Sequence, residues 1–332
     1  MMPTKTRAIL AEGPRTPFRP VELELRQPGP DEVVVRISAS GINPLDLKIR
    51  AGVAAHARHP LPAVLGLDMA GTVIATGPGE SRFRVGDEVY GMIGGVGGLQ
   101  GSLAEYATVD ANLLARKPTN IDMRAAAALP LVVITAWEGL IDRAQVNPGD
   151  TVLVHGGAGG VGRLVVQMAI AKGARVFATG SAQSRAAIES MGATAIDYLA
   201  DSVEHYLARL TDGAGFDIIY DTVGGATLDA SFAAVRHYTG RVVSCLGWGT
   251  HALAPLSFRG ASYSGVFTLY PLLSGQGRTR HGEILAAAAE MVESGQIKPH
   301  LDPARYTLAT TELAYAAVDS GAALGKVVVE IA

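Results

Sequence analysis

A glycine-rich turn between an apolar strand and a helix constrains the fold of this 332-residue chain most strongly. Residues 151–155 read Thr-Val-Leu-Val-His, a β-branched, apolar run typical of a buried strand. Seven residues rich in glycine follow at 156–162, and the amphipathic segment 161–172 predicts a helix. The free N–H groups and positive dipole end at such a helix start favour phosphate. The pattern therefore predicts a phosphate-binding turn.

The glycines of this turn have the spacing G-x-G-x-x-G. Gly157 is expected to permit the sharp turn, Gly159 to let the backbone approach a pyrophosphate, and Gly162 to allow close helix–strand packing. Gly160 and Val161 open the helix and supply further N–H groups. A tight glycine turn that binds nothing is the alternative, but this turn opens a long series of alternating strands and helices.

That series indicates a parallel sheet with helices on both faces. Its predicted strands are Thr151–His155, Arg175–Thr179, Ala193–Asp197, Phe216–Asp221 and Arg241–Leu246, and the helices between them are Val161–Lys172, Ala182–Met191, Asp201–Leu210 and Gly225–Val235.

The first 120 residues are different, because they read as strands broken by Gly and Pro turns. A helical segment, 122–143, leads out of them, and helices are also predicted at 282–294 and 310–320. The last predicted strand, 326–331, could complete the sheet of the first module. We therefore expect an α/β protein in which a doubly wound parallel-sheet domain is inserted into a β-rich one.

Charge and cysteine content exclude several classes of protein. The formal net charge is −3, which argues against binding nucleic acid or an anionic membrane by bulk charge. Cys245 is the one cysteine, so no internal disulfide forms. The longest apolar stretch, 125–137, is interrupted by Pro130 and is shorter than the roughly 18 residues that a membrane span needs. These features predict a cytoplasmic protein that is not embedded in a membrane.

The end of the second predicted strand indicates which dinucleotide is bound. NAD-preferring sites place Asp or Glu there, about 20 residues after the glycines. Here Thr179 is followed by Gly180 and Ser181, and no carboxylate occurs before Glu189. Ser181 and Arg185 could instead hold a 2′-phosphate, which favours NADP(H), although Arg185 could also be an ordinary surface charge.

Several segments together resemble the medium-chain dehydrogenase/reductase superfamily, and within it the zinc-free quinone oxidoreductase branch that includes the zeta-crystallins. The resemblance implies a GroES-like catalytic domain, 1–125 plus 268–332, with a Rossmann NADP-binding domain, 126–267, inserted. It also implies hydride transfer from NADPH and a homodimer. The segments that carry it are Gly41–Arg50, Pro62–Val73, Val85–Tyr90, Gly101–Tyr106, Thr135–Trp137, His155–Gly162 and Gly325–Val329.

The resemblance also implies that no metal is bound. Zinc-dependent relatives have a Cys ligand where this chain has Asn43, and a Gly-His-Glu triplet where it has Gly66, Leu67 and Asp68. Leucine cannot ligate zinc and asparagine is a poor ligand. His155, in a predicted buried strand, is expected to be a core residue or to hydrogen-bond to a turn.

The catalytic candidates are Asn43, Asp46 and Lys48. Asn43 matches the family's Asn beside the nicotinamide, and Asp46 matches an acidic position. Leu47 and Lys48 occupy positions where the family often has Tyr, so Lys48 or solvent could supply the proton. Alternatively, Lys48 faces solvent and Asn43 only forms the turn before a proline.

Further coenzyme contacts are implied by family positions and by the carboxyl ends of the predicted strands. Packing, helix capping or a strand-edge charge would also explain some of these residues. They are Thr135, Tyr198, Val223, Gly247 and Lys326.

The expected function is that of an NADPH-dependent, zinc-independent quinone oxidoreductase acting on a small hydrophobic acceptor. Without a metal to polarise an alcohol, an already electrophilic conjugated carbonyl is the easier substrate. An ene-reductase of α,β-unsaturated carbonyls would use the same site, so the sequence does not separate the two. A non-catalytic binding or structural protein, as in crystallins, is the third possibility, and the complete glycine pattern argues against it.

Overall fold

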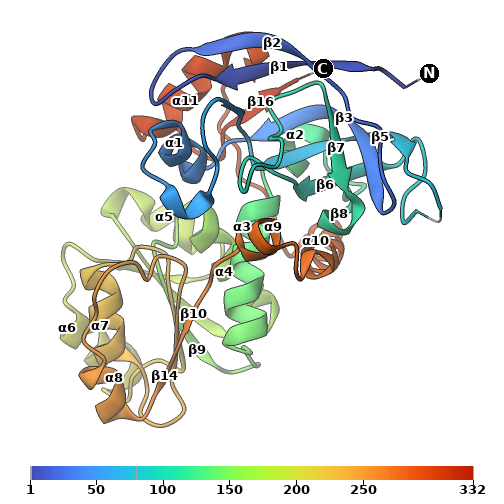
Figure 1. Ribbon diagram of the computed structural model, residues 1–332. Helices are drawn as coiled ribbons and strands as arrows, with labels where there is room; N and C mark the ends of the chain where they lie inside the picture. The colour runs from blue at the N-terminus through green and yellow to red at the C-terminus, as the bar shows by residue number, and fades with distance from the viewer. Residues whose placement is uncertain (1, 80, 332) are drawn as a thin grey trace. The chain divides into compact units, whose positions relative to one another are not determined.

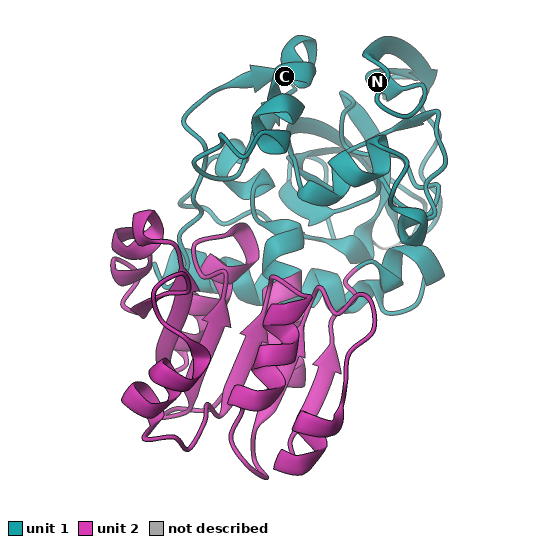
Figure 2. Cartoon of the chain, turned by 90° about the vertical axis from the view of Figure 1, so that its left-hand side faces the viewer, with its two compact units in different colours: residues 1–134, 269–332 teal, residues 135–268 magenta. Residues whose placement is uncertain are grey.

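The computed structural model describes residues 2–79 and 81–331, and the chain divides into two compact units (Figure 2). Unit 1 is Met1–Ile134 with Leu269–Ala332, and unit 2 is Thr135–Thr268. The first and last parts of the chain therefore share one unit, as expected if the second unit is inserted into the first.

Unit 1 is built mainly from antiparallel strands (Figure 1). One sheet has the order β15-β16-β3-β5-β6-β8, with β7 paired to β3, and a smaller sheet has the order β2-β1-β4. The strands are β1 Lys5–Ala11, β2 Phe18–Glu24, β3 Glu32–Gly41, β4 Ala63–Val64, β5 Asp68–Thr76, β6 Glu88–Met92, β7 Tyr106–Asp110, β8 Leu114–Arg116, β15 Tyr306–Thr307 and β16 Val328–Glu330. The helices are α1 Pro44–Arg50, α2 Met123–Ala127, α3 Pro130–Trp137 (which continues into unit 2), α9 Tyr270–Ser274, α10 Arg278–Glu293 and α11 Thr311–Asp319.

The final strand completes the sheet of the first module, as predicted. In β16, Val328 lies opposite Gly41 of β3 in antiparallel register. The alternating side chains Val33, Val35 and Ile37 of β3 are fully buried in the core of this unit. The pairing of β16 with β3 thus holds Lys326, two residues before β16, beside the segment that follows β3.

Unit 2 has one six-stranded sheet in which every paired strand is parallel. Its order, β11-β10-β9-β12-β13-β14, reverses direction at β9, which is the Rossmann arrangement. The predicted fold class is therefore confirmed. The strands are β9 Thr151–His155, β10 Arg175–Gly180, β11 Thr194–Asp197, β12 Ile218–Asp221, β13 Arg241–Ser244 and β14 Ser262–Gly265, and the helices are α4 Gly160–Ala171, α5 Arg185–Glu189, α6 Val203–Thr211, α7 Ala226–Ala234 and α8 Ala254–Arg259.

The parallel strands are apolar on both faces because helices cover both. All four residues of β12 are buried, and so are the last four of β9. Leu153, Phe216 and Ile219 belong to one buried cluster with residues of α7. This burial explains why continuous apolar runs, rather than alternating ones, marked these strands in the sequence.

Several elements differ from the sequence-based expectation, and the short helices α1, α8 and α9 were not predicted. Strand β14 was not predicted, because Ser-Tyr-Ser-Gly is short, polar and largely exposed at the sheet edge. The helix predicted at 182–191 shortens to α5, preceded by a 3₁₀ turn. The helix from 131 changes to a π-helix at Glu138–Arg143, where a Cβ on Gly139 would lie 2.3 Å from the Tyr220 ring. No helix within 2–79 and 81–331 is long and apolar enough to cross a bilayer.

Candidate active site

The glycine turn after β9 has the geometry of a phosphate cradle. Gly156 has φ +73°, and Gly159 is the N-cap of α4 with φ −74° and ψ 170°. The left-handed backbone conformation therefore lies at Gly156, whereas the sequence pattern assigned the special dihedral to Gly157. Thr179 holds this turn, because its Oγ1 accepts the Gly156 N–H at 3.1 Å and its carbonyl accepts the Gly157 N–H at 2.9 Å.

Each glycine of the pattern meets a different requirement. A Cβ on Gly157 would lie 2.5 Å from the Ala178 Cβ, and one on Gly162 would lie 2.2 Å from the Gly156 oxygen. Both residues are therefore glycine because of packing within the protein. A Cβ on Gly159 would meet only the Gly156 oxygen, at 3.3 Å, so this residue faces an open side.

The open side suits a pyrophosphate. Gly159 and Gly160 are exposed and Val161 is half-buried. The first N–H groups of α4, at Gly160, Val161 and Gly162, have no acceptor within the helix because it begins at Gly160. A ligand with negatively charged oxygens would satisfy these donors and complement the helix dipole. The turn therefore fits the phosphates of a dinucleotide.

The residues predicted to select the coenzyme lie around the end of β10. Ser181 lies 3.2 Å from the Ser184 hydroxyl, and Arg185 lies 3.4 Å from the Glu189 carboxylate, with both of those charged side chains about half exposed. Tyr198 is 59% exposed. The sequence reading overlooked Asp197, which ends the neighbouring strand opposite Gly180 and accepts the Leu199 N–H at 3.0 Å. No carboxylate lies on β10 itself.

Thr135, Val223 and Gly247 were also predicted to contact the coenzyme. Thr135 is buried on α3, with its hydroxyl 2.9 Å from that of Thr268 and its carbonyl accepting the Tyr220 hydroxyl at 2.6 Å. Val223 follows β12 and is 52% exposed, and Gly247 follows β13 and is exposed. The last two therefore lie in loops at the carboxyl edge of the parallel sheet.

A compact polar cluster in unit 1 contains Asn43, Asp46, Asp68 and Lys326. Asn43 is fully buried between β3 and α1, and its Nδ2 donates to Asp68 at 2.9 Å. Lys326 is half-buried, and its Nζ donates to the Asn43 Oδ1 and, at 3.0 Å, to the Ile42 carbonyl. The Asn43 amide is therefore held from both ends, which leaves one Nδ2 hydrogen.

Backbone donors satisfy the two carboxylates of this cluster. Asp46 accepts the N–H groups of Asn43 at 2.8 Å and of Gly66 at 3.1 Å. Asp68 accepts the N–H of Leu131, in the first turn of α3, at 2.9 Å. The sequence identified Asn43 and Asp46 together, but it placed Lys326 near the coenzyme and did not link it to them.

Burial controls the electrostatics of this cluster. It raises the pKa of Asp46 to about 7 and that of Asp68 to about 6, and it lowers the pKa of Lys326. Lys326 opposes the rise at both carboxyls, which are stabilised as carboxylates by its charge. Lys48, by contrast, is exposed on α1.

These pKa values predict how stability depends on pH. A carboxyl whose pKa is higher in the folded state binds more protons when folded, so its contribution falls as pH rises from about 4 through the folded pKa. For Asp68 the loss is roughly 3 kcal/mol, complete slightly above pH 6. We expect Asp68→Asn to flatten the decline between pH 4 and 7 in urea unfolding. Parallel pH profiles of the two proteins would contradict this assignment.

The cluster does not provide a metal-binding donor set. Among residues 2–79 and 81–331, no three His, Cys, Asp or Glu side chains are grouped so that they could hold a metal ion. The Asn43 amide is directed to Lys326 and Asp68, and Leu67 is fully buried.

Two family descriptions match the sequence. Residues 29–119 match the alcohol dehydrogenase GroES-like domain, and residues 191–329 match a family described as zinc-binding dehydrogenase. A 2-methylene-furan-3-one reductase of Solanum lycopersicum is 37% identical, over 90% of this chain and 71% of its own length. A chloroplastic NADPH-dependent alkenal/one oxidoreductase of Arabidopsis thaliana is 36% identical, over 90% and 72%.

Solved structures share the whole fold. An alcohol dehydrogenase superfamily protein from Novosphingobium aromaticivorans is 52% identical with a TM-score of 0.96, over 98% of this chain and all of its own. A mycobacterial quinone oxidoreductase is 29% identical with a TM-score of 0.84, over 98% and 99%. The similarity thus extends over both units.

Proposed function

Because the chain belongs to the medium-chain dehydrogenase/reductase superfamily, in its quinone oxidoreductase and alkenal reductase-like branch, we propose that it reduces a conjugated carbonyl acceptor with NADPH. It is an NAD(P)H oxidoreductase, and the quinone or enone acceptor, the preference for NADPH and the independence of zinc are the proposed refinements. Bound coenzyme would supply the hydride. The protein contributes binding, orientation and hydrogen-bond donors.

The observation that carries the proposal is that the Asn43 side chain is hydrogen-bonded to both Lys326 and Asp68. The position where zinc-dependent relatives have a cysteine is here an amide held by a lysine and a carboxylate. These side chains offer no set of ligands for a Lewis acid. An acceptor that is electrophilic before binding, a quinone or an enone, needs only hydrogen bonds to the oxygen on which charge collects.

The chain's own residues would divide this work. Gly159, Gly160 and Val161 would hold the coenzyme phosphates through backbone N–H groups. Asn43 remains our candidate for orienting the acceptor oxygen, through its remaining Nδ2 hydrogen, with Asp46 fixing the turn that carries it. Lys48 and solvent both remain candidates for supplying the proton. Lys48 is exposed, so its ammonium group and water are equally accessible there.

Reduction of an enone rather than a quinone is the second candidate. The two plant relatives at 36% and 37% identity are named for an alkenal/one and a methylene-furanone, whereas two structural relatives named as quinone oxidoreductases are 29% and 25% identical. Steady-state rates with a 1,4-quinone and a 2-alkenone, at equal NADPH and in the presence and absence of a chelator, test both. If the protein reduces neither acceptor, the proposal is refuted. If a chelator lowers the rate, independence of zinc is refuted.

The preference for NADPH leads to a prediction about Arg185. Replacing it with glutamate puts a negative charge beside the proposed 2′-phosphate site and creates a like-charged pair with Glu189 four residues away. We expect Arg185→Glu to weaken NADPH binding about tenfold and to leave NADH binding nearly unchanged, as measured by coenzyme fluorescence. Lys172→Glu, at the far end of α4, is the charge control. Equal affinities for NADPH and NADH in the unmodified protein would refute the preference.

We also propose that the protein is a homodimer. Strand β14 lies at the edge of the sheet in unit 2, and β13 is its one strand partner among the described residues. Such an edge presents unpaired N–H and C=O groups to another strand. Light scattering after size exclusion is expected to give the mass of two chains, and the mass of a single chain at micromolar concentration would contradict it.

A further inference from the structure

Four polar side chains form a row across the carboxyl edge of the sheet in unit 2. They are Thr179 of β10, His155 of β9, Asp221 of β12 and Ser244 of β13, each at most 5% exposed. Asp221 is in register with His155 on one side and with Ser244 on the other. His155 Nδ1 lies 3.2 Å from the Thr179 hydroxyl, which extends the row to the glycine turn.

Asp221 is the centre of this row and bonds to both loops that follow its strands. Its Oδ1 accepts the N–H groups of Val223 and Gly224, each at 3.0 Å. Its Oδ2 accepts the Ser244 hydroxyl at 2.7 Å, and the Ser244 oxygen in turn accepts the Leu246 N–H at 3.0 Å. One fully buried carboxylate therefore fixes the first residues of the loop after β12 and, through Ser244, of the loop after β13.

Asp221 has no ion pair with a lysine or an arginine in the described parts of the chain. Its neighbour His155 is neutral near pH 7, because burial lowers the pKa of the imidazole to about 4. A buried carboxylate without a counter-charge depends on hydrogen-bond donors. The amides of the loop are therefore obligatory partners of Asp221.

The loop after β12 adopts a conformation that needs this support. Gly224 and Gly225 have φ +78° and +55°, and a Cβ on Gly224 would lie 2.5 Å from the Leu246 oxygen. With the Val223 and Gly224 amides turned inward to Asp221, the Val223 side chain is left 52% exposed.

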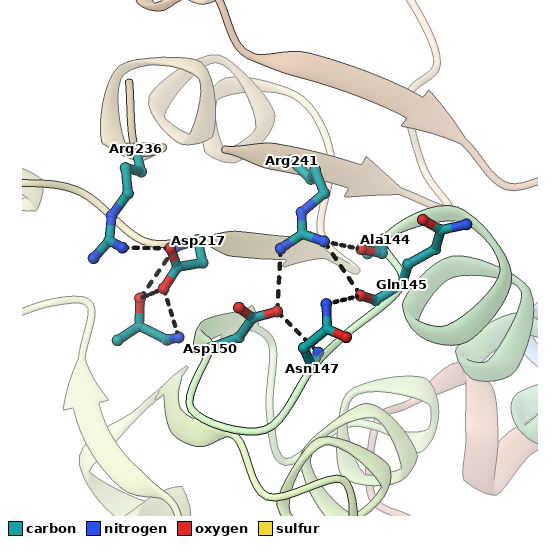
Figure 3. Close-up of polar contacts among 8 residues, drawn as sticks. Ala144, Gln145, Asn147, Asp150, Asp217, Arg236 and Arg241 are labelled. Carbon is teal, nitrogen blue, oxygen red and sulfur yellow. Dashed lines mark hydrogen bonds and ion pairs between the residues drawn. The ribbon is translucent and has the colours of Figure 1, made fainter. Parts of the chain in front are cut away.

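The other end of the same strand is built differently (Figure 3). Asp217, four residues earlier, accepts the Thr151 N–H at 2.8 Å and pairs with Arg236 at 2.5 Å. Next to it, Asp150 pairs with Arg241 at 3.1 Å. The amino edge is thus closed by charge-neutralising ion pairs, whereas at the carboxyl edge the negative charge is held by loop amides. Ligands of open parallel sheets bind at the carboxyl edge.

From this contrast we infer that Asp221 is a positioning residue for the coenzyme: its carboxylate, with Ser244, pre-forms loops 222–225 and 245–249 in the conformation that binds the dinucleotide. The inference rests on the proposed function only in taking a nicotinamide dinucleotide as the ligand. Without this carboxylate the loops would have to be ordered at the expense of binding energy.

The test compares two isosteric substitutions on one strand. Asp221→Asn removes the buried charge and turns one accepting oxygen into an NH₂ donor. Facing Gly224, this group would meet another donor; facing Ser244, it would require the Ser244 hydroxyl to stop donating to this position, so the hydrogen bonds that hold the two loops are weakened in either orientation. Asp217→Asn makes the same chemical change at the amino edge. For each protein we would measure NADPH and NADH dissociation constants by coenzyme fluorescence, the melting temperature, and hydrogen exchange of residues 222–225 without coenzyme.

We expect Asp221→Asn to raise the coenzyme dissociation constant about tenfold or more, and to expose the Val223 and Gly224 amides to exchange. Asp217→Asn should lower the melting temperature and leave the dissociation constant within about twofold. If Asp221→Asn does not fold, Ser244→Ala, which removes one donor, should produce the smaller change in the same direction.

Two results would overturn the inference. One is an unchanged dissociation constant in Asp221→Asn or, if that variant does not fold, in Ser244→Ala. The other is a loss of affinity in Asp221→Asn and Asp217→Asn that simply follows their loss of stability. Hydrogen exchange of the free protein tests the loop-forming role without coenzyme. An unmodified protein that binds coenzyme but reduces no quinone or enone would refute the proposed function and leave this inference standing.

Discussion

Replacing Gly159 with glutamate is expected to weaken coenzyme binding roughly a hundredfold or more, because a carboxylate placed about 4 Å from a phosphate repels it by several kcal/mol at low effective dielectric. Gly159 is exposed, and a Cβ there would meet only the Gly156 oxygen at 3.3 Å. Its φ of −74° suits any residue. The new side chain would therefore extend into the open side of the turn, where the phosphates are proposed to bind.

The fold should tolerate this change. Gly159 is the N-cap of α4, where replacing glycine with a residue that caps poorly costs about 1 kcal/mol at most. Coenzyme fluorescence titration measures the affinity, and a thermal melt checks folding. Gly159→Gln, of the same size but uncharged, separates repulsion from bulk and should retain more of the affinity. A Gly159→Glu variant that binds NADPH as the unmodified protein does would remove the basis for placing the coenzyme at this turn.

Replacing Lys326 with methionine is expected to lower the free energy of unfolding by about 3 kcal/mol near pH 8, because it leaves a buried carboxylate pair without its counter-charge. Lys326 donates to Asn43 and Ile42, and its charge opposes the rise in the pKa values of Asp46 and Asp68. Methionine matches the length of the chain but supplies neither the charge nor the donors.

The loss should depend on pH. At pH 5 the two carboxyls can be protonated, so the missing charge matters less and the destabilisation should be clearly smaller than at pH 8. Urea unfolding at both pH values measures it. Lys48→Met, on an exposed position of α1, is the matched control and should change stability by less than about 0.5 kcal/mol. Equal losses at pH 5 and pH 8, or equal losses in the two lysine variants, would mean that Lys326 does not neutralise this cluster.

Local sequence signals recovered most of the secondary structure of unit 2. Strand β9 has the predicted bounds, and α4 begins at Gly160 as expected, because glycine spacing and apolar runs reflect requirements within a few residues. Strand β14 was not predicted, because a polar edge strand lacks the apolar run that is typical of a strand buried on both faces. The left-handed conformation of Gly156 was not predicted either, because a run of glycines does not show which of them adopts a positive φ.

Partners distant in sequence could not be predicted in the same way. Lys326 lies 283 residues after Asn43, and only the pairing of β16 with β3 brings the two together. In the sequence, Asp221 ends one predicted strand and Ser244 lies within the next, with nothing to indicate that one buried carboxylate would hold both following loops.

The sequence by itself determined the parallel-sheet unit, its glycine cradle and the absence of a carboxylate from the end of β10, because each depends on the order of neighbouring residues. Only the tertiary structure decided which groups face each charge: Lys326 faces Asp46 and Asp68, Arg236 faces Asp217, and loop amides with the Ser244 hydroxyl face Asp221. The physical reason is that burial and pairing fix the state of a charged group, and both depend on chain segments that are remote in sequence.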